Sequence, residues 1–277
     1  MAVCYRHPNR ETGVSCSSCG RPICPDCMTP TPVGMRCPEC SKQKTQVRTM
    51  DSARGGVEAT RILIGLNILV FIAEVASGAG GFWNVGSSTV FQRGALSGVD
   101  VYIGHDYWRL ITSGFLHAGI LHIAFNMYIL WILGNMLEPA IGTVRFVAIY
   151  FVSLLGGAFG ALLLADPRTA TVGASGAVFG LMGAAFFELR ARGVDPFQAG
   201  IGGLIVFNLL LSVIVPGISI GGHLGGLVAG ALSALALQLG DRRRSQLLGL
   251  AMCVALGVAA TAAAIATAAS KTSSLIG

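Results

Sequence analysis

The chain has 277 residues, a net charge of +6, and a composition that is 53% hydrophobic and only 12% charged. This composition excludes an ordinary water-soluble domain. No basic and aromatic pattern typical of a nucleic-acid groove is present, so we expect no nucleic-acid partner. The first residues are polar and rich in Cys, Arg and Pro, unlike a cleavable signal peptide, so membrane insertion is expected to depend on internal segments.

Residues 1–42 contain seven of the eight cysteines of the chain, in pairs separated by two residues. A two-residue spacer lets both side chains of a pair reach one tetrahedral Zn²⁺, so the eight candidate ligands suit two structural ions. A disulfide framework is the alternative, but it needs an oxidising compartment and has no use for a Cys-x2-His pair. Since about 40 residues cannot build a sufficient apolar core, metal binding is expected to supply the folding free energy.

The spacing of these ligands resembles that of B-box-type zinc fingers, in which the pairs alternate in a cross-brace. The resemblance implies one ion bound by Cys4, His7, Cys24 and Cys27, and a second bound by Cys16, Cys19, Cys37 and Cys40. No open coordination position is implied, so we expect a structural domain or one that binds a cytoplasmic protein partner. A polar linker is predicted over residues 43–58.

Seven apolar runs follow, and each reaches or approaches the length of about 20 residues that a helix needs to cross a bilayer. We predict spans near residues 61–78, 114–137, 145–165, 171–188, 198–215, 219–238 and 246–269. The segment between the first two spans is too long for a turn and is expected to contain short helices. The fold class is therefore an all-α polytopic membrane protein.

The distribution of Lys and Arg predicts a cytoplasmic N-terminus and an outside C-terminus, because basic residues are enriched in inner loops. The outer segments would then hold Arg93, Arg109, Arg168 and Lys271, against a larger set of basic residues inside. This orientation places the paired cysteines in a reducing compartment, which again favours zinc over disulfides. We expect a multi-pass protein of the plasma membrane.

Polar side chains lie at similar predicted depth in the second, fourth and sixth spans, which all run from outside to inside. Ser175 and His223 lie about one turn into their spans, and His122 lies about two turns into its span with Asn126 one turn deeper. A lone serine in a membrane helix usually back-bonds to its own helix. Ionisable residues within a membrane are costly, however, and their coincidence at one depth points to a function.

The chemistry of these residues is typical of a serine hydrolase. Ser175 needs a base to take its proton, and His223 is the candidate. No buried carboxylate is expected at this depth, which favours a dyad over a triad. His122 and Asn126 could donate hydrogen bonds to an oxyanion, together with free backbone N–H groups beside Ser175.

Small residues near these positions favour close helix packing. Gly176 and Gly180 form one small-xxx-small face, and Gly222, Gly226 and Gly230 form another around His223. Phe179 lies one turn below Ser175, where it could hold the imidazole ring in place. Alternatively, Phe179 is an ordinary apolar residue that packs in the core or faces the lipid.

These motifs resemble those of rhomboid intramembrane serine proteases. The matching segments are Gly173-Ala174-Ser175-Gly176, His223-Leu224-Gly225-Gly226 with Gly230, His117-x4-His122-x3-Asn126, Trp108-Arg109, and Glu138 at the end of the second span. The resemblance covers about residues 60–240. It implies a six-helix rhomboid core over residues 59–240, with an additional transmembrane helix in 241–277.

The resemblance also implies roles for individual residues. Ser175 would be the nucleophile and His223 the base, with the oxyanion held by His122, Asn126 and the backbone N–H of Ser175. Gly173 and Gly176 support the motif, and Phe179 stands where the family often has a tyrosine stacked under the histidine. The implied substrates are transmembrane segments of membrane proteins in the lipid bilayer, cleaved near the outer leaflet without a catalytic cofactor.

Two other classes of function compete with this interpretation. A metalloprotease or metal transporter could use His117, His122 and His223, but the chain has no HExxH and His117 is five residues from His122. His117 is better interpreted as a structural residue at the start of its helix. A catalytically inactive rhomboid-like adaptor with a zinc finger is the more serious alternative, although the nucleophile and the base are both present.

Overall fold

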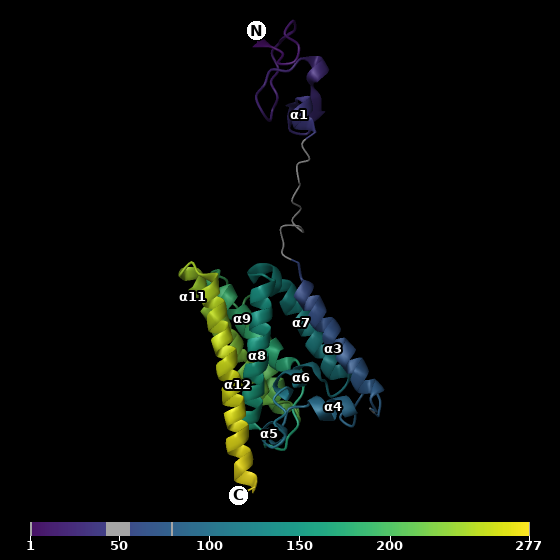
Figure 1. The fold of residues 1–277 in the computed structure, drawn as a ribbon, viewed down its shortest axis with the longest axis vertical. Helices are drawn as coiled ribbons and strands as arrows, with labels where there is room; N and C mark the ends of the chain where they lie inside the picture. Colours follow the sequence, from purple (N-terminus) through teal and green to yellow (C-terminus); the bar gives the residue numbers. More distant parts are fainter. Residues whose placement is uncertain (1, 43–55, 79, 277) are drawn as a thin grey trace. The chain divides into compact units, whose positions relative to one another are not determined.

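The computed structural model describes residues 2–42, 56–78 and 80–276. The chain divides into two compact units, residues 1–53 and 54–277 (Figure 1). Most of the predicted linker lies outside the described residues. Its last residue, Glu58, already begins a helix.

The N-terminal unit is small and is built around its cysteines. Two antiparallel strand pairs and two short helical turns form it: β1 (Ala2–Val3), β2 (Glu11–Thr12), η1 (Pro25–Cys27), β3 (Thr29–Thr31), β4 (Gly34–Arg36) and α1 (Pro38–Ser41). Its buried cluster consists of Ile23 and six of the cysteines. One isoleucine is the only aliphatic residue in that cluster, so apolar burial alone gives this unit little stability.

The second unit is a helical bundle. Its long helices are α3 (Glu58–Ala76), α7 (Ile120–Ile141), α8 (Thr143–Leu164), α9 (Ser175–Ala191), α10 (Ile201–Ile214), α11 (Ile220–Arg242) and α12 (Gln246–Ile276). Each predicted span therefore coincides with a helix. Five of these helices are long and apolar enough to cross a membrane, whereas α9 and α10 have 17 and 14 residues. The protein is thus a multi-pass membrane protein.

The segment between α3 and α7 contains the expected short helices, α4 (Thr89–Gly94), α5 (Gly98–Tyr102) and α6 (Arg109–Thr112), followed by the 3-10 turn η2 (Ser113–Phe115). Arg109 is buried and holds this segment together. Its guanidinium donates to the carbonyls of Gln92 and Ala95 at 2.8 Å each. It also pairs with Asp106, at 2.8 Å. In the Trp108-Arg109 motif, Arg109 therefore has a structural role, while Trp108 is exposed.

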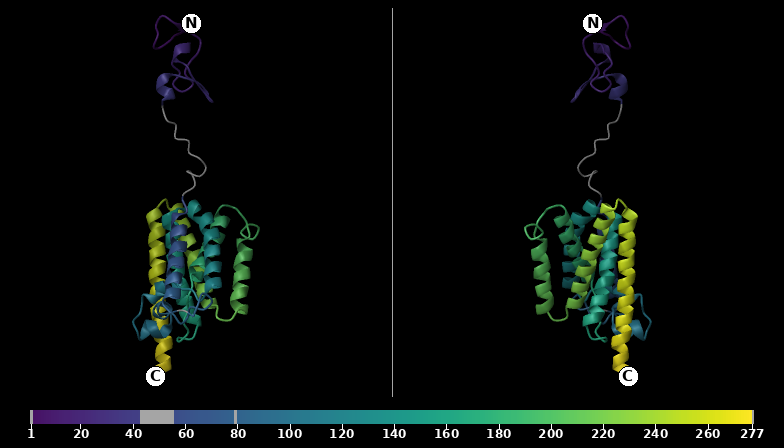
Figure 2. Two further views of the ribbon diagram at one scale, coloured as in Figure 1. Left: turned by 90° about the vertical axis from the view of Figure 1, so that its right-hand side faces the viewer. Right: turned by 90° about the vertical axis from the view of Figure 1, so that its left-hand side faces the viewer.

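The central helices of the bundle are α8, α9 and α11, which pack against one another. In Figure 1, α7, α9 and α11 all begin at the end of the bundle where α4 to α6 lie. Figure 2 shows α10 at the edge of the bundle, where it packs on α9 and α11. The N-terminal ends of α7, α9 and α11, which carry the predicted site residues, therefore meet at one end of the unit.

Glycines bring α9 and α11 into backbone contact. A Cβ at Gly226 would collide with the carbonyl of Gly176, and a Cβ at Gly230 with the carbonyl of Gly180. These are the small-residue faces predicted from the sequence, and they face each other. The contact between Gly226 and Gly176 lies within one turn of His223 and next to Ser175.

Two helices begin four to six residues later than predicted. The second span begins with α7 at Ile120, because Ser113–Phe115 forms a 3-10 turn and the extended Gly119 lies so close to the carbonyl of Trp83 that no Cβ fits. The fourth begins with α9 at Ser175, because Gly173 has a φ of +128° and stands outside the helix. His122 and Ser175 therefore lie in the first turns of their helices. The prediction that they lie one or two turns inside was wrong.

Candidate active site and metal centres

A cavity of about 800 Å³ opens among α7, α8, α9, α10 and α11. Its lining includes the side chains predicted to be catalytic, Ser175 and His223, and those predicted to bind an oxyanion, His122 and Asn126. Gly173, Gly176 and Phe179 also line it. The structure thus brings together at one cavity the predicted nucleophile, base, oxyanion-binding side chains and supporting residues. His117, Trp108, Arg109 and Glu138, which belong to the other matching motifs, do not line it.

Ser175 is the first residue of α9, and the loop before it is fixed to the α4–α6 segment. Thr171 and Leu96 exchange two backbone hydrogen bonds, of 2.8 and 3.0 Å, and Gly173 N–H donates to the Ser113 carbonyl at 2.9 Å. The first N–H groups of a helix have no partner within the helix. Ser175 therefore presents its hydroxyl and its free backbone N–H at the same edge of the cavity.

His223 is 7% exposed and is held by contacts from two other helices. Its ring stacks on Phe179 of α9, with the ring centroids 4.1 Å apart and the planes at 18°. Its Nδ1 lies 2.5 Å from the hydroxyl oxygen of Ser212 on α10. No direct hydrogen bond joins Ser175 to His223 among the described side chains. Catalytic hydrogen bonds are often long without substrate and shorten in the substrate complex.

No sequence motif predicts Ser212 as a site residue. Its separation from His223 crosses a turn between two helices, so no helical or strand periodicity relates the two residues. Only the packing of α10 against α11 brings them together. The one signal in the sequence is that Ser212 is a polar residue within the apolar run of α10, and this signal does not indicate which residue it contacts.

His122 and Asn126 lie on the first two turns of α7 and face the cavity. Nδ1 of His122 accepts a hydrogen bond from Ala118 N–H at 3.4 Å, so Nε2 is the nitrogen that carries the ring hydrogen. A Cβ at Gly173 would lie 2.8 Å from this Nε2 and 3.6 Å from the Ser175 hydroxyl. Only a glycine therefore fits between the imidazole and the serine. Asn126 donates one amide N–H to the His122 carbonyl, at 2.9 Å, and retains a second.

His117 is placed apart from this cavity. It is fully buried, its ring centroid lies 5.1 Å from that of His122, and its backbone N–H donates to the Glu74 carboxylate. Within the described ranges, the three histidines His117, His122 and His223 do not form a group with the donor spacing of a metal site. The geometry therefore gives no support to the metalloprotease or transporter alternative.

Comparison with known proteins places this sequence in a family. Residues 104–239 match the family model of the Rhomboid domain. A Bacillus subtilis (strain 168) protein named "Putative rhomboid protease YdcA" is 34% identical over 161 residues, which is 56% of this chain and 81% of that protein. The chain belongs to the rhomboid family.

Two further relatives of this rhomboid protein are longer. Rhomboid protease GluP of Bacillus subtilis (strain 168) is 32% identical over 225 residues, 77% of this chain and 43% of GluP. RHOMBOID-like protein 6, mitochondrial, of Arabidopsis thaliana is 36% identical over 154 residues, 54% of this chain and 50% of that protein. The chain thus spans half or less of the length of these two relatives. The predicted family and fold class are confirmed.

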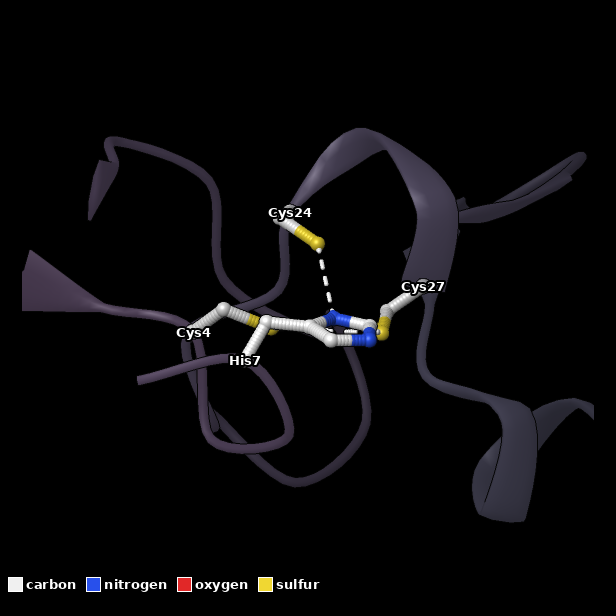
Figure 3. Close-up of side chains that lie close together, drawn as sticks. All are labelled: Cys4, His7, Cys24 and Cys27. Carbon is white, nitrogen blue, oxygen red and sulfur yellow. Dashed lines mark hydrogen bonds between the residues drawn. The ribbon is translucent and has the colours of Figure 1, made fainter. Parts of the chain in front are cut away.

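The N-terminal unit of this rhomboid contains two groups of potential metal ligands, each with its donor atoms within 4.8 Å of one another. They are Cys4, His7, Cys24 and Cys27, drawn in Figure 3, and Cys16, Cys19, Cys37 and Cys40. In the first group His7 Nδ1 lies 3.3 Å from Cys24 Sγ and 3.4 Å from Cys27 Sγ. Cys4 Sγ lies 3.9 Å from Cys27 Sγ. A tetrahedron with metal–sulfur bonds of about 2.3 Å has edges of about 3.8 Å, so the donors fit a tetrahedral ion.

The two groups alternate along the chain, which is the cross-brace that the B-box resemblance implies. Side chains between the ligands connect the two sites. Tyr5 and Arg6, from the first ligand pair, both bind the carboxylate of Glu39, which lies in the last pair. The hydrogen bond from the Tyr5 hydroxyl holds the pKa of Glu39 well below its usual value, at about 2. Glu39 therefore stays ionised and links the two halves of the unit.

Proposed function

We propose that this rhomboid is an intramembrane serine endopeptidase that cleaves transmembrane segments of membrane proteins near the outer leaflet. The observation that carries the proposal is the shared cavity, on which a serine, a buried histidine and two further polar side chains converge from three helices. The curated relatives named as rhomboid proteases support the same activity. Ser175 is the proposed nucleophile and His223 the proposed base.

The reaction follows the chemistry of a Ser–His dyad. The Ser175 hydroxyl oxygen attacks the scissile carbonyl carbon while His223 Nε2 takes the hydroxyl proton. The tetrahedral intermediate then collapses, the C–N bond breaks, and His223 returns the proton to the leaving amine. A water molecule, activated by the same imidazole, hydrolyses the acyl-enzyme and releases the new carboxylate.

The negative charge that develops on the carbonyl oxygen needs donors that are already in place. His122 Nε2–H, the second amide N–H of Asn126 and the backbone N–H of Ser175 are the proposed donors. The two side-chain donors are oriented by other hydrogen bonds: Ala118 N–H binds Nδ1 of His122, and the His122 carbonyl accepts the first amide N–H of Asn126. The backbone N–H of Ser175 has no partner within its helix because it lies in the first turn. The stack on Phe179 fixes the plane of the base.

The walls of the cavity suit an apolar peptide in a membrane. On one side Leu121 and Phe125 of α7 line it, and on the other Leu211 of α10 and Val215, which follows that helix. Leu121 and Phe125 are 70% and 45% exposed. With the N-terminus in the cytoplasm, as the basic residues predict, this cavity opens toward the outer leaflet and the C-terminus lies outside. The plasma membrane is the proposed location.

For the N-terminal unit we propose two structural Zn²⁺ ions and a cytoplasmic protein partner. The Cys-rich donor sets favour zinc because thiolate and imidazole ligands in tetrahedral geometry are typical of structural zinc sites. All four positions of each tetrahedron are filled by protein, so neither ion has a place for a substrate. No catalytic cofactor is proposed.

A cleavage assay with a panel of single-span membrane proteins tests the proposal. The wild-type protein in proteoliposomes is expected to cleave at least one substrate, and Ser175→Ala and His223→Ala are expected to be inactive yet folded. A fluorophosphonate probe should label the wild-type protein and leave Ser175→Ala unlabelled. Cleavage that persists in either variant would remove the dyad. A folded wild-type protein that is neither labelled nor active would instead be an inactive rhomboid-like adaptor.

A further inference from the structure

Ser212 lies on the last turns of α10 and contacts two groups at hydrogen-bond distance. Its hydroxyl oxygen is 2.5 Å from Nδ1 of His223 and 2.7 Å from the carbonyl oxygen of Asn208, one turn earlier on α10. Ser212 is only 5% exposed, and it lines the cavity. Neither the sequence motifs nor the proposed mechanism uses this residue.

The two distances determine which atom carries each hydrogen. The Asn208 carbonyl can only accept, so the short contact between two oxygens needs a hydrogen between them, and only the Ser212 hydroxyl can supply it. A separation of 2.7 Å is normal for an O–H···O bond. The hydroxyl hydrogen therefore points to Asn208, and Ser212 must accept a hydrogen from Nδ1 of His223.

This assignment gives His223 the tautomer that a general base requires. With its hydrogen on Nδ1, the neutral imidazole has a free lone pair on Nε2, and that lone pair can take the proton of Ser175. The opposite tautomer would present an N–H to the serine and could not act as a base. In many serine hydrolases a carboxylate fixes the tautomer in this way, but no carboxylate contacts the His223 ring among the residues that the structure describes.

We propose that Ser212 is a positioning residue for His223, which fixes the tautomer of the base and its rotation within the ring plane. Phe179 fixes the plane itself through the stack. The expected effect on kcat rests on the proposed endopeptidase function, whereas the tautomer of His223 follows from the two contacts of Ser212 alone. Since Ser212 comes from α10, at the edge of the bundle (Figure 2), the base is oriented only while α10 is packed against α11.

Kinetics of two variants and a matched control test the kinetic role. Ser212→Ala removes the acceptor and is expected to lower kcat about tenfold, with KM unchanged, since a single neutral hydrogen bond contributes on this scale. Ser212→Thr keeps the hydroxyl and should restore most of the rate. Ser233→Ala is the control: Ser233 is equally buried, lies on α11 and also bonds to a carbonyl four residues earlier, at 2.8 Å, but it does not line the cavity.

A spectroscopic measurement tests the tautomer independently of catalysis. In protein labelled with ¹⁵N-histidine, the His223 signals, assigned by comparison with His223→Ala, should show a protonated Nδ1 and a bare Nε2. Ser212→Thr should keep this pattern, and Ser212→Ala should give a mixture of tautomers. Unchanged His223 signals in Ser212→Ala, or equal loss of kcat in the Ala and Thr variants, would overturn the proposal. If the wild-type protein cleaves nothing, the endopeptidase function fails, and the spectra still decide the role of Ser212.

Discussion

Asn126 shows how one side chain divides its hydrogen bonds between structure and chemistry. One amide N–H binds the carbonyl of His122 on the preceding turn, which fixes the side-chain rotamer. The other N–H is left for the cavity. Because the first bond is satisfied within the helix, the second donor is held in place before any substrate arrives, which is the condition for stabilising a developing charge.

We predict that Asn126→Ala lowers kcat by a factor of about one hundred and changes KM little, because the donor acts mainly in the transition state. Steady-state kinetics with a cleaved membrane substrate measures both constants. Asn135→Ala is the matched control, since Asn135 lies on the same helix and makes the same bond to a carbonyl four residues earlier, at 2.7 Å, but is exposed and outside the cavity. Unchanged turnover in Asn126→Ala would exclude Asn126 from the site.

At this scale the sequence motifs predicted several of the polar side chains that line the cavity, but they did not include Ser212. The serine, the histidines and Asn126 could be found because they lie at helical spacings or in glycine-rich segments. The spacing of Phe179 does not show whether it is an ordinary core residue or one that supports the histidine ring. The stack on His223 in the structure favours the second role. Ser212 depends on the turn between α10 and α11, which no local pattern encodes.

Among the helices, the contact between α9 and α11 sets the distance between Ser175 and His223. The two backbones touch at Gly176 and Gly226, so Gly226 cannot carry a side chain without moving the helices apart. The sequence predicted these small-residue faces correctly. It did not predict where α7 and α9 begin, because the breaks depend on Gly119 against Trp83 and on the left-handed Gly173.

Gly226→Ala is predicted to destabilise the membrane unit by about 1–3 kcal/mol, the usual cost of overpacking, and to reduce cleavage because the new methyl group pushes α11 away from Ser175. Thermal unfolding in detergent and the cleavage rate provide the measurements. Gly203→Ala on α10 serves as the control, since a Cβ there meets no atom within 4 Å. Equal behaviour of the two variants would contradict the proposed packing constraint.

Glu138 is the second element-scale feature, because a carboxylate from α7 caps the start of α3. It accepts from the backbone N–H groups of Ala59 and Thr60 at 2.9 Å each, and also from the hydroxyls of Thr60 and Thr143. It is fully buried. The position of α3 therefore depends on this one side chain.

We expect Glu138→Gln to lower the free energy of unfolding by about 1–3 kcal/mol, because the neutral amide turns one acceptor into a donor that faces other donors. Chemical unfolding in detergent micelles would measure the loss. Glu188→Gln is the comparison, since Glu188 pairs with Arg192 at the surface, at 2.6 Å, where ion pairs contribute about 0–1 kcal/mol. A Glu138→Gln protein as stable as the wild type would show that the cap is dispensable.

The whole molecule combines two units with different sources of stability. The membrane unit buries a large apolar cluster with its helices, whereas the buried cluster of the N-terminal unit is almost entirely cysteine. The sequence predicted this division because the paired cysteines and the apolar runs occupy separate stretches. The linker predicted over residues 43–58 stays a prediction, because most of it lies outside the described residues.

Metal analysis of the purified protein should give two zinc ions per chain. Cys16→Ser combined with Cys19→Ser should remove one ion and unfold the N-terminal unit, because metal binding supplies its folding free energy. Cleavage of a simple membrane substrate in detergent should persist. Cys253→Ser, which changes the one cysteine outside that unit, should retain both ions. Absence of zinc in the wild-type protein, or cleavage lost in parallel with zinc, would contradict this division of roles.

Lys271 connects α12 to the C-terminal end of α8, so a truncation that removes α12 affects more than that helix. Its ammonium group binds the carbonyls of Leu162, Leu163 and Ala165 at the C-terminal end of α8. Such carbonyls have no partner within their own helix. A shortened version that ends before α12 would leave these acceptors unpaired, and they directly precede the loop that leads to Ser175. Removal of a helix that contributes no residue to the cavity would thereby loosen the approach to Ser175, the proposed nucleophile.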